Sequence, residues 1–209
     1  MFLCLMIFFS CKKNTENMID LTGVVSDEIN SFPINGVSVL LEIKPFGGTS
    51  FSNSFDELET TITNTNGEYY FSFQNSNAVE YRLTFSKQGC FTEQLIINPD
   101  QLSLSENNNI DVSIFSSSYL ILNVSNNLPF NNNDELILST TLISSNIGTC
   151  FNSIVTMLGS SVDTTIACEI YGNQMVEFDY FVTKDNFTSS FSDNVFCGAG
   201  DTLYKYINY

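Results

Sequence analysis

The chain has 209 residues and carries 23 acidic against 7 basic side chains, a formal net charge of -16. A body this negative repels phosphate backbones, so the composition excludes nucleic acid as a partner. The sequence contains no histidine, which removes Ser-His-Asp and Cys-His catalysis and histidine-ligated metal sites. It also lacks tryptophan, the residue with the largest aromatic stacking face. We therefore expect no enzyme, no cofactor and no metal site.

The chain opens with a short apolar stretch, Met1 to Phe9, which is followed by Ser10-Cys11-Lys12-Lys13. This stretch has the length of a signal-peptide core and is too short to cross a bilayer as a helix. With its small residue before Cys11, it resembles the lipobox of bacterial lipoproteins. The resemblance implies cleavage after residue 10 and lipidation of Cys11, so residues 1–10 would be the signal peptide and 11–18 a polar tether.

Two departures from the lipobox pattern leave alternatives open. No lysine or arginine precedes the apolar stretch, which an upstream start codon would explain, and Phe8 stands where leucine is more common. An ordinary cleaved signal is the alternative interpretation.

After the tether, short runs of branched and aromatic residues dominate, separated by Asn, Gly, Pro and Ser. In the first half these runs are Val24, Val37 to Ile43, Tyr69 to Phe73, Tyr81 to Phe85, Gln94 to Ile97 and Ile110 to Ile114. No segment of twelve or more residues keeps its apolar positions at helical spacing. The pattern predicts an all-β protein made of two β-sandwich domains in tandem.

Four motifs of the first half occur in a recognisable order: Gly23-Val24-Val25, Pro33 to Val39, Thr63 to Phe71, and Tyr81 to Gly89. Together they resemble the carboxypeptidase regulatory-like domain. The resemblance implies a transthyretin-like, seven-stranded sandwich over residues 19–116. In carboxypeptidases this module accompanies a separate zinc catalytic domain, and no such domain is present in this sequence.

Local features of this domain carry their own expectations. Asn66-Gly67 is typical of a tight hairpin, because both residues tolerate a positive φ. Tyr69, Phe71 and Phe73 alternate along one strand and are expected to face the core. The segment from Phe46 to Thr61 has the composition of an exposed loop and is a candidate contact surface.

The serine run at 116–118 marks the expected boundary with a second β-sandwich, residues 117–209, for which the sequence suggests no family. In Met175 to Thr183 the apolar side chains alternate with Glu177 and Asp179, as in a half-buried antiparallel strand. The other expected strands are Tyr119 to Val124, Glu135 to Leu142, Asp163 to Tyr171, Asn194 to Cys197 and Thr202 to Tyr209.

Four cysteines remain once Cys4 leaves with the signal and Cys11 takes lipid: Cys90, Cys150, Cys168 and Cys197. An exported protein can hold disulfides, and three pairings are possible. We favour Cys168 with Cys197, because both lie in apolar, strand-like runs of the same half.

Other chemistry finds little support in the sequence. Paired carboxylates could hydrolyse glycosides, but Asp27/Glu28, Asp56/Glu57, Asp134/Glu135 and Glu177/Asp179 are adjacent or on a solvent face, and none is expected to be buried. The asparagine-rich loops at 107–111 and 131–135 offer oxygen ligands for calcium without the spacing of a known motif. A covalent Lys-Asn crosslink would need a buried lysine facing an asparagine or aspartate, and the sequence selects none of Lys44, Lys87, Lys184 and Lys205.

These observations predict a non-catalytic protein anchored through Cys11 in the cell envelope of a Gram-negative bacterium, in the outer membrane, facing the periplasm or the exterior. Its expected role is a structural or interaction module that contacts a protein or a polysaccharide. The alternatives are a glycan-binding lipoprotein that uses exposed tyrosines such as Tyr204, Tyr206 and Tyr209, and a hydrolase with two facing carboxylates.

Overall fold

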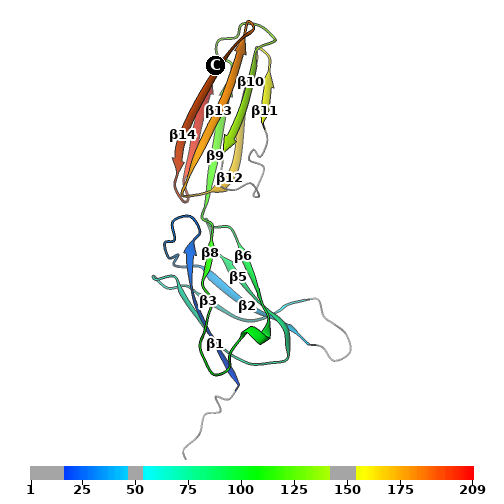
Figure 1. Ribbon diagram of the computed structural model, residues 1–209, viewed down its shortest axis with the longest axis vertical. Coiled ribbons are helices and arrows are strands. Elements are labelled where there is room, and N and C mark those ends of the chain that lie inside the picture. Colours follow the sequence, from blue (N-terminus) through cyan, green and yellow to red (C-terminus); the bar gives the residue numbers. More distant parts are fainter. Residues whose placement is uncertain (1–16, 47–53, 142–153) are drawn as a thin grey trace, which may run out of the picture.

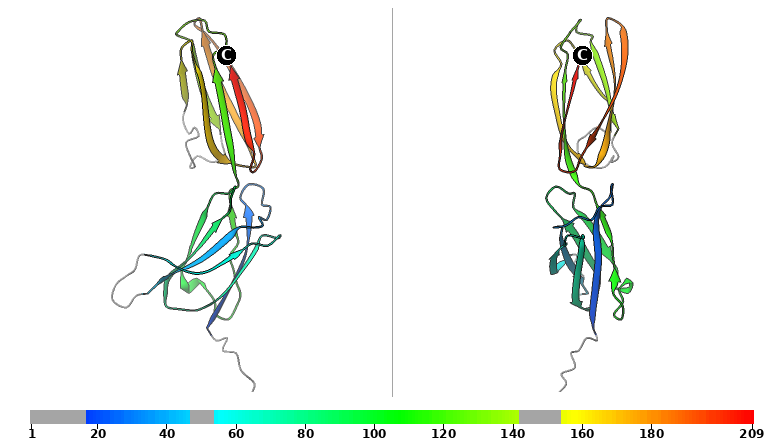
Figure 2. Two further views of the ribbon diagram at one scale, coloured as in Figure 1. Left: turned by 180° about the vertical axis from the view of Figure 1, so that it is seen from behind. Right: turned by 90° about the vertical axis from the view of Figure 1, so that its left-hand side faces the viewer.

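The computed structural model describes residues 17–46, 54–141 and 154–209, and these residues are almost entirely β. They form two β-sandwiches, which lie end to end (Figures 1 and 2). The first strand, β1 (Met18–Asp27), begins at the outer end of the first sandwich, and the C-terminus lies towards the outer end of the second (Figure 1). The prediction of an all-β tandem sandwich is confirmed. Among the described residues, no helix has the length and apolar character needed to cross a bilayer.

The first sandwich contains two sheets of four strands. In one sheet the central strand β1 pairs with β4 on one side and with β7 and β8 on the other. The other sheet has the order β3-β2-β5-β6, followed in the chain by a single 3-10 turn, η1. The elements are β1 (Met18–Asp27), β2 (Ser38–Pro45), β3 (Asp56–Ile62), β4 (Glu68–Gln74), β5 (Ala78–Ser86), β6 (Glu93–Ile97), η1 (Pro99–Gln101), β7 (Asn108–Asn109) and β8 (Val112–Ile114).

Strands β7 and β8 are two halves of one strand that runs parallel to β1. Between them, the Ile110 N–H donates to the Thr22 carbonyl, and the Asp111 carboxylate accepts from the Val24 N–H at 2.9 Å. With these halves counted together, the first sandwich has seven strands.

Alternating side chains fill the space between the two sheets of the first sandwich. Tyr69, Phe71 and Phe73 are buried as predicted, and they contact the buried side chains of the facing sheet, such as Leu83 and Phe85. The ring of Tyr69 meets that of Phe85 edge to face at 5.7 Å.

The second sandwich also has two sheets, of orders β11-β10-β13-β14 and β12-β9-β15. Its last strand, β15, runs parallel to its first strand, β9. A separate buried cluster lies between these sheets, with Leu120, Leu138 and Phe178 among its members. The strands are β9 (Ser117–Ser125), β10 (Glu135–Thr141), β11 (Val155–Leu158), β12 (Asp163–Tyr171), β13 (Gln174–Lys184), β14 (Phe187–Cys197) and β15 (Thr202–Asn208).

Two local predictions in the first sandwich are wrong. Asn66-Gly67 does not close a hairpin, because β3 and β4 belong to different sheets and only Gly67 of this pair has a positive φ, +74°. The expected loop at 46–61 contains most of β3, which pairs with β2 at the edge of its sheet. Its side chains are nearly all exposed, so its composition is that of a loop although its backbone is that of a strand.

The second sandwich has a tight hairpin that the sequence analysis missed. Asp185 and Asn186 have φ values of 48° and 64° and join β13 directly to β14, with Lys184 opposite Phe187. Two successive positive φ values are typical of the type I′ turn. Because of this turn, β14 begins at residue 187, well before the predicted start at Asn194.

Candidate functional site

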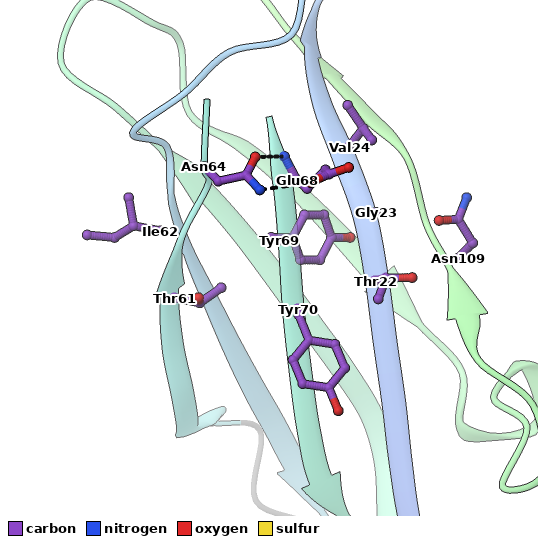
Figure 3. A pocket seen from close by; sticks show the side chains of 10 residues that line it. All are labelled: Thr22, Gly23, Val24, Thr61, Ile62, Asn64, Glu68, Tyr69, Tyr70 and Asn109. Carbon is purple, nitrogen blue, oxygen red and sulfur yellow. Dashed lines mark hydrogen bonds between the residues drawn. The ribbon is translucent and has the colours of Figure 1, made fainter. Parts of the chain in front are cut away.

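The first sandwich has an open hollow of about 490 Å³ beside β1 and β4 (Figure 3). It is bordered by Thr61 and Ile62 of β3 and by Tyr69 and Tyr70 of β4. The two strands are edges of different sheets, so the hollow marks the open side of the sandwich.

The polar groups of this hollow are held by bonds within the protein. Asn64 accepts the backbone N–H groups of Asn66 and Glu68 and donates to the Glu68 carboxylate at 2.8 Å. The Tyr69 hydroxyl donates to the Ile110 carbonyl at 2.7 Å, and burial, with the nearby Asp111 charge, raises the pKa of Tyr69. Glu68 is the one carboxylate among the lining residues, so the hollow can accept a small polar molecule but has no acid and base pair.

Two of the carboxylates considered for catalysis are buried, contrary to the sequence-based expectation. Asp27 and Asp134 are 3% and 0% exposed. For each, burial raises the pKa, but hydrogen bonds lower it by more, so the net shift is downward. Both groups are therefore ionised at neutral pH, so neither holds the proton that the general acid of a glycoside hydrolase must supply. Glu177 and Asp179 face solvent on β13, as predicted.

Asp134 organises its own loop. Its carboxylate accepts the backbone N–H of Phe130 at 2.8 Å and of Asn131 at 3.1 Å, and also the side-chain amide of Asn126 at 2.8 Å. These donors occupy the carboxylate oxygens of Asp134, one of the groups considered for calcium. No group of three or more Asp, Glu, Cys or His side chains that could hold a metal occurs in the described ranges.

The structure contradicts the favoured disulfide. Cys197 is a buried free thiol, Cys90 is also free, and Cys168 is disulfide-bonded, so the predicted pair Cys168–Cys197 is wrong. Cys168 lies in β12 and Cys197 at the end of β14, and these strands belong to different sheets. The lipidation site Cys11 lies outside the described residues.

Of the three tyrosines considered for glycan binding, two lie on the outer face of β15. Tyr204 and Tyr206 are 56% and 63% exposed, and Tyr119 on β9 is 52% exposed. Tyr209 is half-buried instead and packs against the second core. Its ring lies 5.1 Å from the Lys184 ammonium.

The two sandwiches meet at a polar contact centred on Asp27, at the end of β1. Its carboxylate accepts the Ser116 hydroxyl at 2.5 Å and the backbone N–H groups of Ile29 and Asn30 at 3.1 Å. The side-chain amide of Asn173, in the turn between β12 and β13, donates to the same carboxylate at 3.3 Å. Asp27 thus binds the connecting segment and the second sandwich at once.

An aromatic contact stands beside Asp27. Tyr171, the last residue of β12, stacks on Phe115 with ring centroids 3.7 Å apart and planes at 11°, and it meets Phe91 edge to face at 5.0 Å. The Gly172 N–H donates to the Ser116 carbonyl at 2.8 Å. We call Asp27, Phe91, Phe115, Ser116, Tyr171, Gly172 and Asn173 the junction.

Sequence reasoning missed the junction and placed only a short serine join there. One signal was present: Asp27 begins a turn in which its side chain accepts N–H groups two and three residues on, a common role of aspartate. The partners from the second sandwich have no comparable signal.

No family model matches the chain, and no curated protein matches it. Solved structures with similar folds include the Bacillus anthracis TIE protein (10% identity, TM-score 0.39, 92% of this chain and 34% of that chain). A streptococcal ancillary pilin has 13% sequence identity and a TM-score of 0.37, and the match covers 93% of this chain and 63% of the pilin. The major pilin SpaD of Corynebacterium diphtheriae has 11% identity and a TM-score of 0.40, and the match covers 87% of this chain and 65% of the pilin. This chain therefore spans about a third of the first protein and less than two thirds of the other two. At these values the similarities assign neither family nor function.

Proposed function

We propose that this chain is a non-catalytic, lipid-anchored module of the bacterial envelope, which holds a contact surface for a protein or a polysaccharide away from the membrane. Anchoring is proposed at Cys11, in the outer membrane of a Gram-negative bacterium. The domains proposed are the sandwiches 19–116 and 117–209, after the tether 11–18.

The junction is the observation that carries this proposal. The Asp27 carboxylate is only 3% exposed and has hydrogen-bond partners in the connecting segment and in the second sandwich. Together with the stacked rings of Phe115 and Tyr171, it restricts bending between the sandwiches. Strand β1 begins at one end of this stiff body, and the second sandwich occupies the other end (Figure 1). A stiff body attached at one end sets a fixed distance between an anchor and the surface it presents.

The anchor is tested by substituting Cys11→Ala in the full chain expressed in a Gram-negative host. We expect the wild type to fractionate with membranes and to incorporate a fatty-acid probe, and the variant to lose both properties. Cys90→Ala is the matched control, because it removes a free cysteine of the folded body. Unchanged membrane retention of Cys11→Ala would refute the anchor.

Glycan binding is the second candidate, and the outer face of the sheet β12-β9-β15 favours it. Tyr204 lies beside Ile121 and Tyr206 beside Asn123 in the parallel register of β15 and β9. Asn123 accepts the Thr165 hydroxyl at 2.7 Å on this face. Exposed aromatic rings on one face of a sheet, with amide and hydroxyl groups beside them, are suited to stacking and hydrogen bonding with a sugar.

A glycan array, followed by titration of each hit, tests this candidate. The double variant Tyr204→Ala/Tyr206→Ala should weaken binding at least roughly tenfold, because it removes both rings, each worth about 1 kcal/mol. Tyr70→Ala, which removes an exposed tyrosine of the first sandwich, should leave binding unchanged. An array without hits at millimolar sugar would count against a glycan ligand.

A further inference from the structure

Three polar side chains converge at the outer end of the second sandwich. Asn126 follows β9, Asp134 precedes β10, and Lys184 ends β13. The Lys184 ammonium donates to the Asn126 side-chain oxygen at 2.8 Å, and the Asn126 amide nitrogen donates to Asp134 at 2.8 Å. Asn126 is 7% exposed and Asp134 is fully buried.

We infer that Lys184 and Asn126 are joined by an intramolecular amide bond, formed without any other protein, with Asp134 as the proton carrier. Asn126 contacts both of the other groups needed for such a transfer: the amine, at its side-chain oxygen, and a carboxylate, at the nitrogen that must leave. Holding reactants together in this way replaces the entropy cost of a bimolecular encounter.

The step balances with no co-reactant. Asp134 takes a proton from the Lys184 ammonium, and the neutral Nζ attacks Cγ of Asn126. The bond from Cγ to Nδ2 breaks as Asp134 returns its proton to Nδ2. The new amide keeps one hydrogen on Nζ, and the other proton of the attacking amine leaves with Nδ2, so the products are the amide and an ammonium ion. Asp134 ends as the carboxylate with which it began.

Surrounding contacts hold the amine in this position. The Lys184 ammonium also donates to the Leu128 carbonyl and lies 5.1 Å from the centre of the Tyr209 ring. The buried Asp134 carboxylate is itself fixed by the backbone N–H groups of Phe130 and Asn131. These contacts restrict the rotation of both the Lys184 ammonium and the Asp134 carboxylate.

The other lysines of the described ranges have different partners. Lys44 pairs with the carboxylate of Glu80 at 3.3 Å, Lys205 pairs with that of Asp193, and Lys87 donates to the backbone carbonyl of Asn35. Among the lysines of the described ranges, Lys184 is the one that donates a hydrogen bond to a side-chain carboxamide. An amide bond from Lys184 to the Asn126 carboxamide would release ammonia, whereas an amide bond from Lys44 or Lys205 to its carboxylate partner would release water. The mass of the crosslinked peptide therefore distinguishes these two kinds of bond.

The bond would tie together two different sheets. Asn126 follows β9 of one sheet and Lys184 ends β13 of the other. A crosslink there closes the outer end of the sandwich covalently and restricts its unfolded state.

The test is peptide mapping of the full wild-type chain after reduction. A glutamate-specific protease places Asn126 in the peptide 107–135 and Lys184 in the peptide 178–209. We expect a branched peptide made of these two, lighter than their sum by the mass of the ammonia expelled on amide formation, and no tryptic cleavage after Lys184. Linear peptides with an unmodified Lys184 and Asn126 would overturn the inference, and so would a loss of water that maps to Lys205 and Asp193 instead.

Variants test the role of Asp134. Asp134→Asn keeps the shape of the side chain but removes the proton carrier, so we expect the branched peptide to fall at least tenfold. Lys184→Arg should abolish it, and Lys205→Arg, the matched control, should leave it unchanged. Should Asp134→Asn fail to fold, the wild-type map still decides whether the bond exists. A branched peptide at full yield in a folded Asp134→Asn protein would overturn the assigned role of Asp134.

Discussion

Asp27 shows how one buried charge can hold a junction. Its carboxylate accepts five hydrogen-bonded groups: the Ser116 hydroxyl, three backbone N–H groups and the Asn173 amide. Hydrogen bonds to a charged group contribute about 1.5 to 3 kcal/mol each before desolvation is subtracted. We expect Asp27→Asn to lower the free energy of unfolding by roughly 1 to 3 kcal/mol, measured by urea denaturation at neutral pH.

The same substitution has a predicted pH dependence. Burial raises the pKa of Asp27, but its hydrogen bonds hold the pKa below the ordinary value of 3.8. A depressed pKa in the folded state means that the stabilisation is present above pH 3.8 and is lost as the pH falls through the folded value. The stability difference between wild type and Asp27→Asn should therefore shrink below that pH. Glu28→Gln, at the exposed neighbouring position, is the control, and a difference that stays constant with pH would contradict the assignment.

Residues that follow from strand alternation were predictable, and residues that follow from distant partners were not. Tyr69 and Phe71 were placed in the core because they share one face of a strand, a property of the local backbone. Asp27 was expected to be exposed because aspartate usually is. Its burial depends on Ser116 and Asn173, which lie 89 and 146 positions away in the chain.

At the scale of elements, the close approach of β1 to the segment between β7 and β8 depends on Gly23. A Cβ at Gly23 would lie 1.8 Å from the Ile110 carbonyl oxygen and 2.9 Å from the Tyr69 ring. That oxygen also accepts the Tyr69 hydroxyl. Gly23→Ala must therefore separate the strands or displace the ring, and we expect a loss of about 3 kcal/mol or more in the free energy of unfolding.

Gly36→Ala is the control for this substitution. Gly36 has a φ of +68°, but no atom lies within 4 Å of an added Cβ, so only backbone strain of about 1 to 2 kcal/mol is expected. Chemical denaturation measures the loss in the free energy of unfolding for each of the two variants. An equal loss of stability in the two proteins would show that the approach of the strands does not depend on Gly23.

Strand existence was easier to predict than strand pairing. The alternation in Val176 to Val182 identified β13, since its buried and exposed positions are adjacent in sequence. Strand β3 was missed because an acidic edge strand that is exposed at nearly every position has no buried apolar face. The prediction that Asn66-Gly67 closes a hairpin was wrong, because a turn motif does not determine whether the next strand joins the same sheet or the opposite one.

At the scale of the whole molecule, the tandem arrangement followed from the spacing of short strands, and the short serine join predicted limited bending. The contacts across the join could not be predicted. Tyr171, Phe115 and Phe91 are ordinary core-type residues in sequence, and their stacking across the junction is a property of the assembled chain. The disulfide prediction failed for the same reason, because sharing a half of the chain does not place two cysteines in one sheet.

The proposed stiffness makes a measurable prediction for Tyr171→Ala. Removing the ring takes away both aromatic contacts of the junction while each sandwich keeps its own buried cluster. Small-angle X-ray scattering of the wild type should fit one extended arrangement of the two sandwiches. The variant should require a distribution of arrangements with a smaller mean maximum dimension, because bent forms become accessible.

Tyr206→Ala, which changes an exposed position of the second sandwich, is the control and should scatter like the wild type. Scattering from Tyr171→Ala that superimposes on the wild type would show that Asp27 and its partners alone fix the junction.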